Sequence, residues 1–162
     1  MKSLYIMRHA KAIPHNTAPT DFQRQLTEGG LNDANEMGIR LYEKKPHLQV
    51  IISSPAKRTK ETAETVAKAL QMDACKIIYD EDIYESSPHN LARIVSEISD
   101  KYNSVMLVGH NPAFTYMMEY FCNKQIDNLP TSGMFLVEFE TNTWKEATKH
   151  NGNLKWADWP KL

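Results

Sequence analysis

The stretch LYIMRHAKA, Leu4 to Ala12, joins an apolar run to an arginine and a histidine that stand side by side. The run from Leu4 to Met7 has the length and composition of a short buried strand. A guanidinium and an imidazole at the end of such a strand form either a solvated turn or part of a site that binds negative charge. The residues that follow the other predicted strands decide between these two interpretations.

Further apolar runs alternate with helical patterns along most of the chain. Apolar residues recur at helical spacing after LTEGG and after SSPAKR, and again behind two N-cap signals, Ser87-Pro88 and Asn111-Pro112. This alternation predicts an α/β fold, a three-layer sandwich whose mostly parallel central sheet is covered on both faces. The further predicted strands are residues 50–53, 76–79 and 104–109, and the predicted helices fall within 31–42, 59–70, 87–98 and 111–121.

The last third of the chain has a different pattern. The segments GMFLVEFE (133–140) and WKEATKH (144–150) are interpreted as alternating strands around a turn at Thr141 to Thr143. They predict a β-hairpin on the far side of the sheet. The tail NGNLKWADWPKL (151–162) is expected to pack back onto the domain.

Length and composition indicate one globular domain, residues 1–162. Hydrophobic residues make up 41% of the 162 residues, charged residues 24%, and the formal net charge is -1, so nothing in the overall charge favours nucleic acid or acidic membranes as partners. The cysteines, Cys75 and Cys122, form no metal-binding or disulfide pattern, which suggests a reducing compartment. We find no signal peptide and no run of membrane-spanning length, and expect a cytoplasmic protein.

Polar residues follow several of the predicted strands at the point where each strand ends. In a parallel sheet the ligand crevice lies beyond the carboxyl ends of the strands, so these side chains are expected to meet. Each also has a simpler explanation: a surface ion pair with Glu61 for Arg58, a buried structural role for His110, and a helix cap for Ser54-Pro55. The combination favours a phosphate receptor built from Arg8, His9, Arg58 and His110.

The motifs MRHAKA, LTEGG, SSPAKRTKETA and VGHNP resemble the histidine phosphatase superfamily, also called phosphoglycerate-mutase-like, and within it the short SixA-type phosphohistidine phosphatases. The resemblance runs from Leu4 to about Pro112, with Ala10 where many members have Gly. It implies an α/β sandwich and a covalent mechanism in which His9 attacks phosphorus. A pocket with several cations keeps such an imidazole neutral. Arg8, Arg58 and His110 are then expected to hold the phosphoryl oxygens.

The sequence offers two carboxylates that could donate a proton to the leaving group, and it does not decide between them. Glu85 follows the third predicted strand, where larger family members carry an acidic donor, and Asp21 lies in the loop after Arg8-His9, where short members often have an aspartate. Each is equally well explained as a solvated loop carboxylate. Arg24 is either an additional phosphate ligand or the ion-pair partner of Glu28 or Asp21.

The expected substrate follows from the short connection between the third and fourth strands. Residues 80–103 have room for little beyond one helix, and an open rim suits a phosphorylated side chain on a phosphorelay-type protein. A broad small-molecule phosphomonoesterase and a non-catalytic phosphoprotein-binding module remain alternatives, whereas the chain is too short for a mutase. No cofactor and no metal are expected, because the six histidines show no ligand spacing and the arginines supply positive charge.

Overall fold

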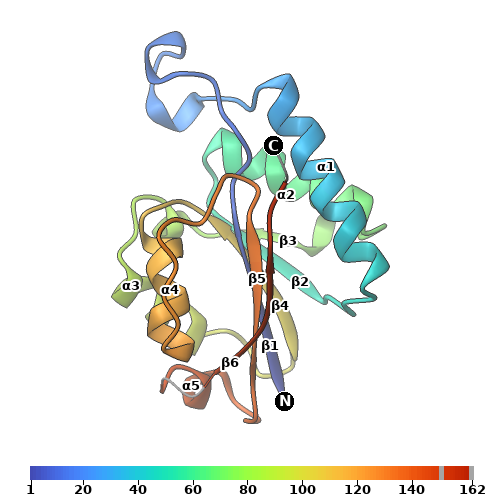
Figure 1. Cartoon of the computed structure of the whole chain (residues 1–162), viewed down its shortest axis with the longest axis vertical. Helices are drawn as coiled ribbons and strands as arrows, with labels where there is room; N and C mark the ends of the chain where they lie inside the picture. Colours follow the sequence, from blue (N-terminus) through green and yellow to red (C-terminus); the bar gives the residue numbers. More distant parts are fainter. Residues whose placement is uncertain (150–151, 161–162) are drawn as a thin grey trace.

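In the computed structural model, which describes residues 1–149 and 152–160, a mixed sheet of six strands forms the centre of the molecule (Figure 1). The strand order is β3-β2-β4-β1-β5-β6. The strands are β1 (Lys2–Arg8), β2 (Val50–Ser53), β3 (Ile77–Tyr79), β4 (Ser104–Gly109), β5 (Met134–Phe139) and β6 (Asn153–Asp158).

The apolar runs of the sequence form the parallel part of this sheet. Strand β4 pairs in parallel with β1 and β2, and β2 pairs in parallel with β3. Every residue of β4 is buried, as expected for a central strand that is covered on both faces. The predicted α/β architecture with a mostly parallel sheet is therefore confirmed.

Helices cover both faces of the sheet and make three layers (Figure 1). In β1, Leu4 and Ile6 belong to the hydrophobic core on one side, whereas Tyr5 and Met7 belong to the core on the other. Helices α3 (Pro88–Ser96), α4 (Ala113–Cys122) and the short α5 (Trp144–Ala147) cover the first side, and α1 (Glu28–Glu43) and α2 (Lys57–Ala69) cover the second.

Polar side chains cap the first turns of α1 and α3. The Ser87 hydroxyl accepts a hydrogen bond from the backbone N–H of Asn90 at 3.1 Å, and the Thr27 hydroxyl accepts one from Gly30 at 2.9 Å. A Cβ atom at Gly30 would collide with the carbonyl oxygen of Lys11. The first turn of α1 therefore lies directly against the segment that follows β1, and only glycine allows this approach.

The predicted hairpin between residues 133–140 and 144–150 is wrong in its second strand. Residues Trp144–Ala147 form a helical turn capped by the Thr143 hydroxyl, and His150 lies outside the described residues. Trp144 is fully buried and its indole N–H donates to the carbonyl of Tyr102 at 2.9 Å, which a strand paired with β5 would not permit. Strand β5 pairs antiparallel with β1 on one side and with β6 on the other. The tail forms β6 and thus packs onto the domain as expected.

Short helical turns occupy the connections between the main elements. Turns η1 (His15–Thr17) and η2 (Asp21–Gln23) lie between β1 and α1, η3 (Ala74–Lys76) precedes β3, and η4 (Glu81–Ile83) follows it. Three of the four therefore lie in connections that leave a parallel strand at its carboxyl end. Turns η1 and η2 contribute His15 and Asp21 to the lining of a cavity at this end of the sheet, and Tyr84 and Glu85 follow η4 there.

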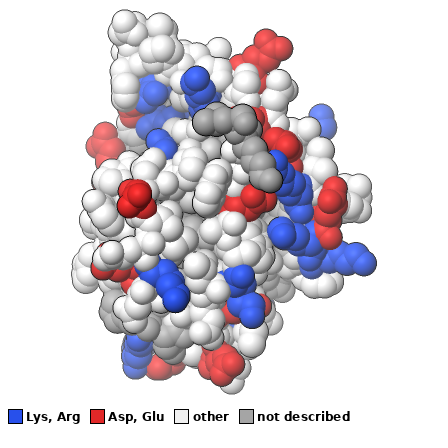
Figure 2. Space-filling model, in the orientation of Figure 1, with Lys and Arg blue, Asp and Glu red and all other residues white. Residues whose placement is uncertain are grey.

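The surface carries charges of both signs. Figure 2 shows basic and acidic side chains interspersed over one face of the molecule. In the part of the chain that the structure describes, no helix is both long and apolar enough to cross a membrane. Because basic and acidic side chains are mixed on this surface, any preference for an anion must come from a local arrangement of cations.

Candidate active site

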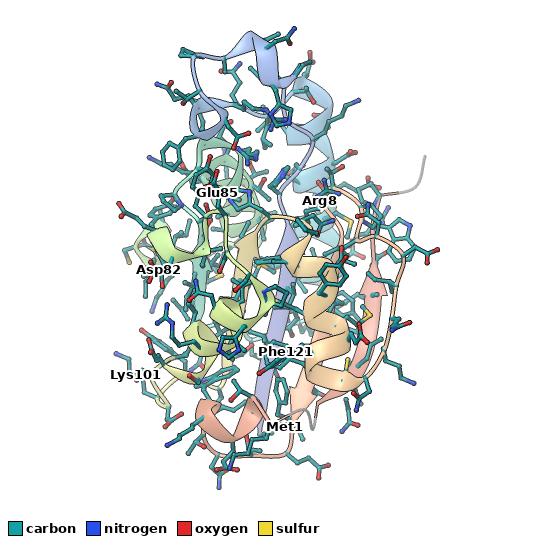
Figure 3. All side chains as sticks on the ribbon, turned by 90° about the vertical axis from the view of Figure 1, so that its left-hand side faces the viewer. Met1, Arg8, Asp82, Glu85, Lys101 and Phe121 are labelled. Atoms are coloured by element: carbon teal, nitrogen blue, oxygen red, sulfur yellow. The ribbon has the colours of Figure 1, made fainter. Side chains whose placement is uncertain are left out.

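A cavity of about 550 Å³ lies at the carboxyl ends of the parallel strands. Its lining includes three arginines and three histidines: Arg8, Arg24, Arg58, His9, His15 and His110. Figure 3 shows Arg8 and Glu85 toward one end of the molecule, with Met1 and Lys101 toward the other. The four side chains that the sequence singles out as a phosphate receptor thus lie around one cavity.

His9 is held at the junction of β1 and β4. Its backbone N–H donates to the carbonyl of Gly109 at 3.0 Å, and its ring Nδ1 lies 2.7 Å from the carbonyl oxygen of Ala10. Because a carbonyl oxygen only accepts hydrogen bonds, Nδ1 carries the proton and Nε2 keeps a free lone pair. Burial lowers the pKa of His9 to about 4, reinforced by the charges of Arg58 and Arg8, although the hydrogen bond to Ala10 opposes the shift. His9 is therefore neutral at pH 7, with a lone pair on Nε2.

Two arginines, the half-buried Arg8 and the buried Arg58, line the cavity together with this imidazole. Arg8, the last residue of β1, donates from Nη1 to the carbonyl of Leu129 at 2.9 Å. Arg58, on the first turn of α2, is 6% exposed and donates to the backbone carbonyl and the carboxylate of Asp21, at 2.8 and 3.1 Å. The alternative pairing of Arg58 with Glu61 is wrong, because Glu61 accepts instead from the backbone N–H of Leu26.

His110 completes the group from the end of β4. Its ring lies 5.5 Å from the His9 ring and contacts the Tyr84 ring edge-on at 5.4 Å. Its Nε2 lies 2.8 Å from the hydroxyl of Ser54. Burial lowers the pKa of His110 to about 3, and the charge of Arg58 acts in the same direction. His110 is therefore also neutral at pH 7.

Ser54 does not cap α2, contrary to the alternative left open by the sequence. The N-cap position of α2 is Ala56, which makes no side-chain capping hydrogen bond. The Ser54 hydroxyl accepts only a 3.3 Å contact from the backbone N–H of Ala56 and otherwise faces His110.

Asp21, in the loop after β1, forms hydrogen bonds and ion pairs with Arg24 and Arg58. Its carboxylate accepts from Arg24 at 2.9 Å, from Arg58 at 3.1 Å and from the hydroxyl of Tyr84 at 2.7 Å, and His15 Nδ1 lies 3.3 Å away. Desolvation opposes ionisation, but the hydrogen bonds from Tyr84 and Arg24 and the charge of Arg58 outweigh it and hold the pKa of Asp21 well below its usual value. Asp21 is thus an ionised bridge, and the ion pair suggested as one alternative for Arg24 is present.

Glu85 is placed differently from Asp21. It lines the cavity, is exposed, and has a backbone φ of 55°, in the left-handed region. Within residues 1–149 and 152–160 we find no hydrogen bond or ion pair to its carboxylate. Glu85 is therefore at the mouth of the cavity and available to a bound molecule.

Sequence reasoning missed two residues that support the site. Burial and a hydrogen bond to Asp21 raise the pKa of Tyr84 to about 12, so its hydroxyl remains a donor. Asn111, interpreted only as a cap, also donates from Nδ2 to the carbonyl of Leu129 at 3.1 Å, the same oxygen that holds Arg8. The position of Tyr84 next to Glu85, after a parallel strand, is the one signal in the sequence that points to the first of these roles.

The site contains donors that no other protein group uses. Among the described residues, four buried side-chain atoms have no hydrogen-bond partner, namely Arg8 Nε, Arg58 Nε, His110 Nδ1 and Ser132 Oγ. Three of the four belong to side chains that line this cavity. Unpaired buried donors are costly, so their convergence indicates a site for an anion with several acceptor oxygens.

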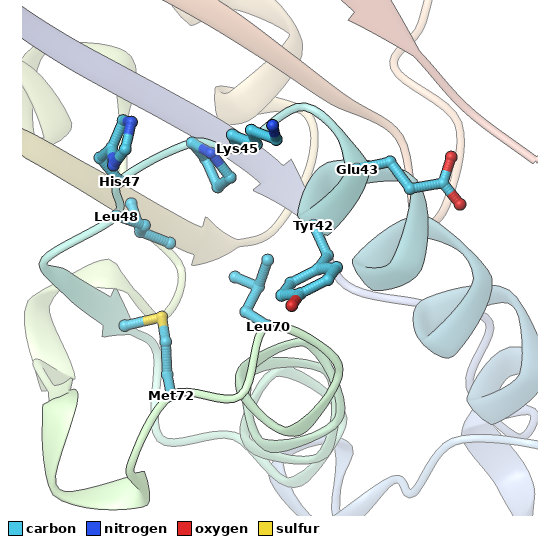
Figure 4. Close-up of a pocket in the computed structure, with 8 residues that line it drawn as sticks. Tyr42, Glu43, Lys45, His47, Leu48, Leu70 and Met72 are labelled. Carbon is cyan, nitrogen blue, oxygen red and sulfur yellow. The ribbon is translucent and has the colours of Figure 1, made fainter.

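A second cavity differs from this one in the residues that line it. It has about 430 Å³ and lies between the ends of α1 and α2, where Tyr42, Leu48, Leu70 and Met72 line it (Figure 4). None of the unpartnered buried atoms found in the described residues belongs to its lining. Unpartnered buried nitrogens thus distinguish the cavity at the carboxyl ends of the strands from this second cavity.

Two curated relatives share part of the sequence. An uncharacterized protein of Mycobacterium leprae is 27% identical over 112 residues, which cover 67% of this chain and 66% of that protein. An uncharacterized protein of Mycobacterium tuberculosis is 29% identical over 107 residues, 65% of this chain and 63% of that protein. The match thus spans slightly less than two thirds of the length of these relatives.

Solved structures match nearly the whole fold. A SixA protein from Agrobacterium tumefaciens has a TM-score of 0.83 at 24% identity, covering 99% of both chains. The protein histidine phosphatase SixA in complex with tungstate has a TM-score of 0.83 at 21% identity, covering 97% of this chain and 96% of that one. A phosphoglycerate mutase from Bacillus anthracis has a TM-score of 0.71 at 14% identity, covering 92% and 96%.

These likenesses show that the fold is phosphoglycerate-mutase-like, as the sequence motifs predict. The family is shown by a different comparison, made on the sequence itself. The model of the histidine phosphatase superfamily (branch 1) matches residues 4–90, more than half of the chain and including Arg8, His9 and Arg58, so the chain belongs to this superfamily.

Proposed function

We propose that this protein removes the phosphoryl group from phosphohistidine on another protein, without a metal ion and through a covalent intermediate on His9. The observation that supports this most is that three side chains with unpartnered buried nitrogens line one cavity with an imidazole whose Nε2 has a free lone pair. Membership of the histidine phosphatase superfamily supports the same chemistry.

The proposed reaction has two steps. First, the lone pair on Nε2 of His9 attacks phosphorus, a new N–P bond forms, and the bond between phosphorus and the substrate nitrogen breaks as that nitrogen takes up a proton. Then water attacks the phosphorus of phosphorylated His9, the N–P bond breaks, and inorganic phosphate leaves while His9 regains its lone pair. No oxidant, reductant or second substrate is required.

The cations are assigned to the phosphoryl oxygens. Arg8 and Arg58 each keep an unpaired Nε–H, and His110 keeps an unpaired Nδ1, in side chains that line the cavity. Transition-state charge in phosphoryl transfer lies on the equatorial oxygens, so fixed donors that contact them stabilise it most. Arg24, already bound to Asp21, lines the same cavity and adds positive charge.

The two candidate proton donors are separated by their surroundings. Asp21 is held ionised by Tyr84, Arg24 and Arg58 and has no proton to give at neutral pH. We therefore assign proton donation to Glu85, which lies at the mouth of the cavity, and assign to Asp21 the positioning of Arg58 and Arg24.

The shape of the rim supports a protein substrate. Between β3 and β4 the chain forms only the turn η4 and the helix α3, with no long insertion that would enclose a small molecule. Two structures of similar fold are SixA proteins, one of them described as a protein histidine phosphatase.

The first experiment tests the covalent step. Wild-type protein and His9→Ala are mixed with a protein that carries labelled phosphohistidine, quenched within milliseconds, and analysed for an acid-labile, base-stable phosphoryl adduct. We expect the adduct at His9 in wild type and none in His9→Ala. Absence of the adduct from wild type, or its persistence in the variant, would overturn the covalent route.

The second experiment tests the substrate. kcat/KM for the phosphohistidine protein is compared with kcat/KM for a panel of sugar phosphates, with and without a chelator. We expect a preference for the protein and no effect of the chelator. A preference for sugar phosphates would instead support the small-molecule phosphomonoesterase, and binding without turnover of either class would support the binding module.

A further inference from the structure

Ser54 is a buried polar residue next to the site whose hydroxyl group has no role in the mechanism above. It is fully buried, and its backbone is held on both sides: its N–H donates to Val108 at 3.0 Å, and its carbonyl accepts from the Thr59 hydroxyl at 2.7 Å. Val108 is two residues before His110 on β4. The Ser54 side chain therefore has a fixed position relative to the His110 ring.

The hydrogen-bond partners of Ser54 determine which nitrogen of His110 carries the proton. The Ser54 oxygen accepts from the N–H of Ala56, and within the described residues the one acceptor in reach of its proton is His110 Nε2, at 2.8 Å. If His110 donated instead, both the serine proton and the lone pair on Nδ1 would be buried without partners, a costly arrangement. The donor is therefore Ser54, and Nε2 of His110 is the acceptor.

We propose that Ser54 is a positioning residue that holds neutral His110 in the tautomer with its proton on Nδ1, so that Nδ1–H is presented to a phosphoryl oxygen. The second half of this inference rests on the proposed function, whereas the tautomer itself does not. The Tyr84 ring makes a T-shaped contact with His110, a side chain that lines the cavity, and restricts rotation of the imidazole. Both histidines of the site then carry their proton on Nδ1, but His9 presents a lone pair and His110 a donor.

The tautomer is measured directly by ¹⁵N NMR of histidine-labelled protein at pH 7, because protonated and unprotonated ring nitrogens have well separated shifts. We expect Nδ1 of His110 to be the protonated nitrogen in wild type. A protonated Nε2 would overturn the inference whether or not the protein is a phosphatase.

The variant Ser54→Ala removes the donor, and Ser53→Ala is the matched control. Ser53 is also fully buried, but its hydroxyl donates to the carbonyl of Ser54 at 2.9 Å and does not contact His110. In Ser54→Ala we expect a mixture of His110 tautomers and a loss of about 10- to 100-fold in kcat/KM on the phosphorylated protein. In Ser53→Ala we expect the wild-type tautomer and kcat/KM within about 3-fold of wild type.

A merely structural role would lower the melting temperature of both variants without moving the tautomer. Ser54→Cys, which retains a weak donor, is expected to restore part of the Nδ1–H population and part of the activity. An unchanged tautomer in Ser54→Ala would overturn the inference. If wild-type protein shows the expected tautomer but hydrolyses no phosphohistidine, the proposed function fails while the assignment of Ser54 as donor holds.

Discussion

Cations lie at both ends of strand β1, and the two ends differ in how the protein uses their hydrogen-bond donors. At the amino end of β1, Lys2 is 1% exposed, and its ammonium group donates to the carbonyls of Asp100 and Tyr102 and to the side chain of Asn103, at 2.8, 2.9 and 3.0 Å. At the carboxyl end, Arg8 and Arg58 each retain an Nε–H without a partner.

The difference separates a structural cation from cations that are available to a ligand. An ammonium group has three donors, and the protein uses all three of those of Lys2. The guanidinium groups are held by a few hydrogen bonds and keep further donors for an anion. Burial alone therefore does not identify the site, whereas buried donors without partners do.

The largest expected effect is on turnover when an arginine is lost from the carboxyl end. Arg58→Ala should lower kcat by about two to three orders of magnitude, because it removes one fixed donor from the transition state. Steady-state kinetics on the phosphohistidine protein measure this, with Lys2→Met as the control that should retain kcat. A kcat for Arg58→Ala near that of wild type would contradict the distinction between the structural cation Lys2 and the cations available to a ligand.

The next effect is on stability at the amino end. Lys2→Met should lower the free energy of unfolding by about 3 kcal/mol, because the carbonyls of Asp100 and Tyr102 lose their donor in a buried environment. Urea unfolding followed by circular dichroism measures it. If the variant is as stable as wild type, the three hydrogen bonds of Lys2 do not make it a structural cation.

An anion should stabilise the protein through the carboxyl end alone. At about 100 times its dissociation constant, inorganic phosphate should add about 2.7 kcal/mol to the free energy of unfolding. Thermal unfolding in phosphate and in chloride of equal ionic strength measures the difference. We expect Lys2→Met to keep the increment and Arg8→Ala to lose it, and equal increments in the two variants would contradict the comparison.

The smallest effect is a dependence of stability on pH. The pKa of His9 is about 4 in the folded protein and about 6.5 when unfolded, so the unfolded chain takes up the proton first as the pH falls. The contribution of neutral His9 to the free energy of unfolding is present above pH 6.5 and is lost progressively as the pH falls to 4. Between pH 6.5 and 5, where carboxylates stay ionised, His9 should account for about 2 kcal/mol.

Urea unfolding at several pH values tests this dependence. His9→Gln should reduce the slope without removing it, because His110, whose pKa is also lowered by burial, keeps its own contribution. Lys2→Met should keep the slope of wild type at a lower level of stability. A wild-type profile with no slope between pH 6.5 and 5 would contradict the neutral, buried state of the site histidines.

The sequence was sufficient to place Arg8, His9, Arg58 and His110 around one cavity because their positions follow from backbone topology. Each stands at the end of a parallel strand or on the first turn of the helix that follows, and such positions share one edge of the sheet. The apolar runs that form these strands are unambiguous because they are buried on both faces.

Other parts of the molecule depend on contacts that no local pattern encodes. The position of Asp21 is set by Arg58 and Tyr84, which are distant in sequence, so its bridging role could not be predicted. Trp144–Ala147 is too short for periodicity to distinguish a helix from a strand, and the contacts of Trp144 with Asp100 and Tyr102 decide its conformation.

The carbonyl oxygen of Leu129 accepts from both Arg8 and Asn111. Leu129 itself is fully buried in the core. A main-chain acceptor does not depend on the side chains of the exposed residues around it, so substitutions at exposed positions of the connection between α4 and β5 leave it in place. Adding or removing a residue there would shift the oxygen and release both donors together. We therefore expect homologous sequences to vary more readily by substitution at the exposed positions of this connection than by insertion or deletion.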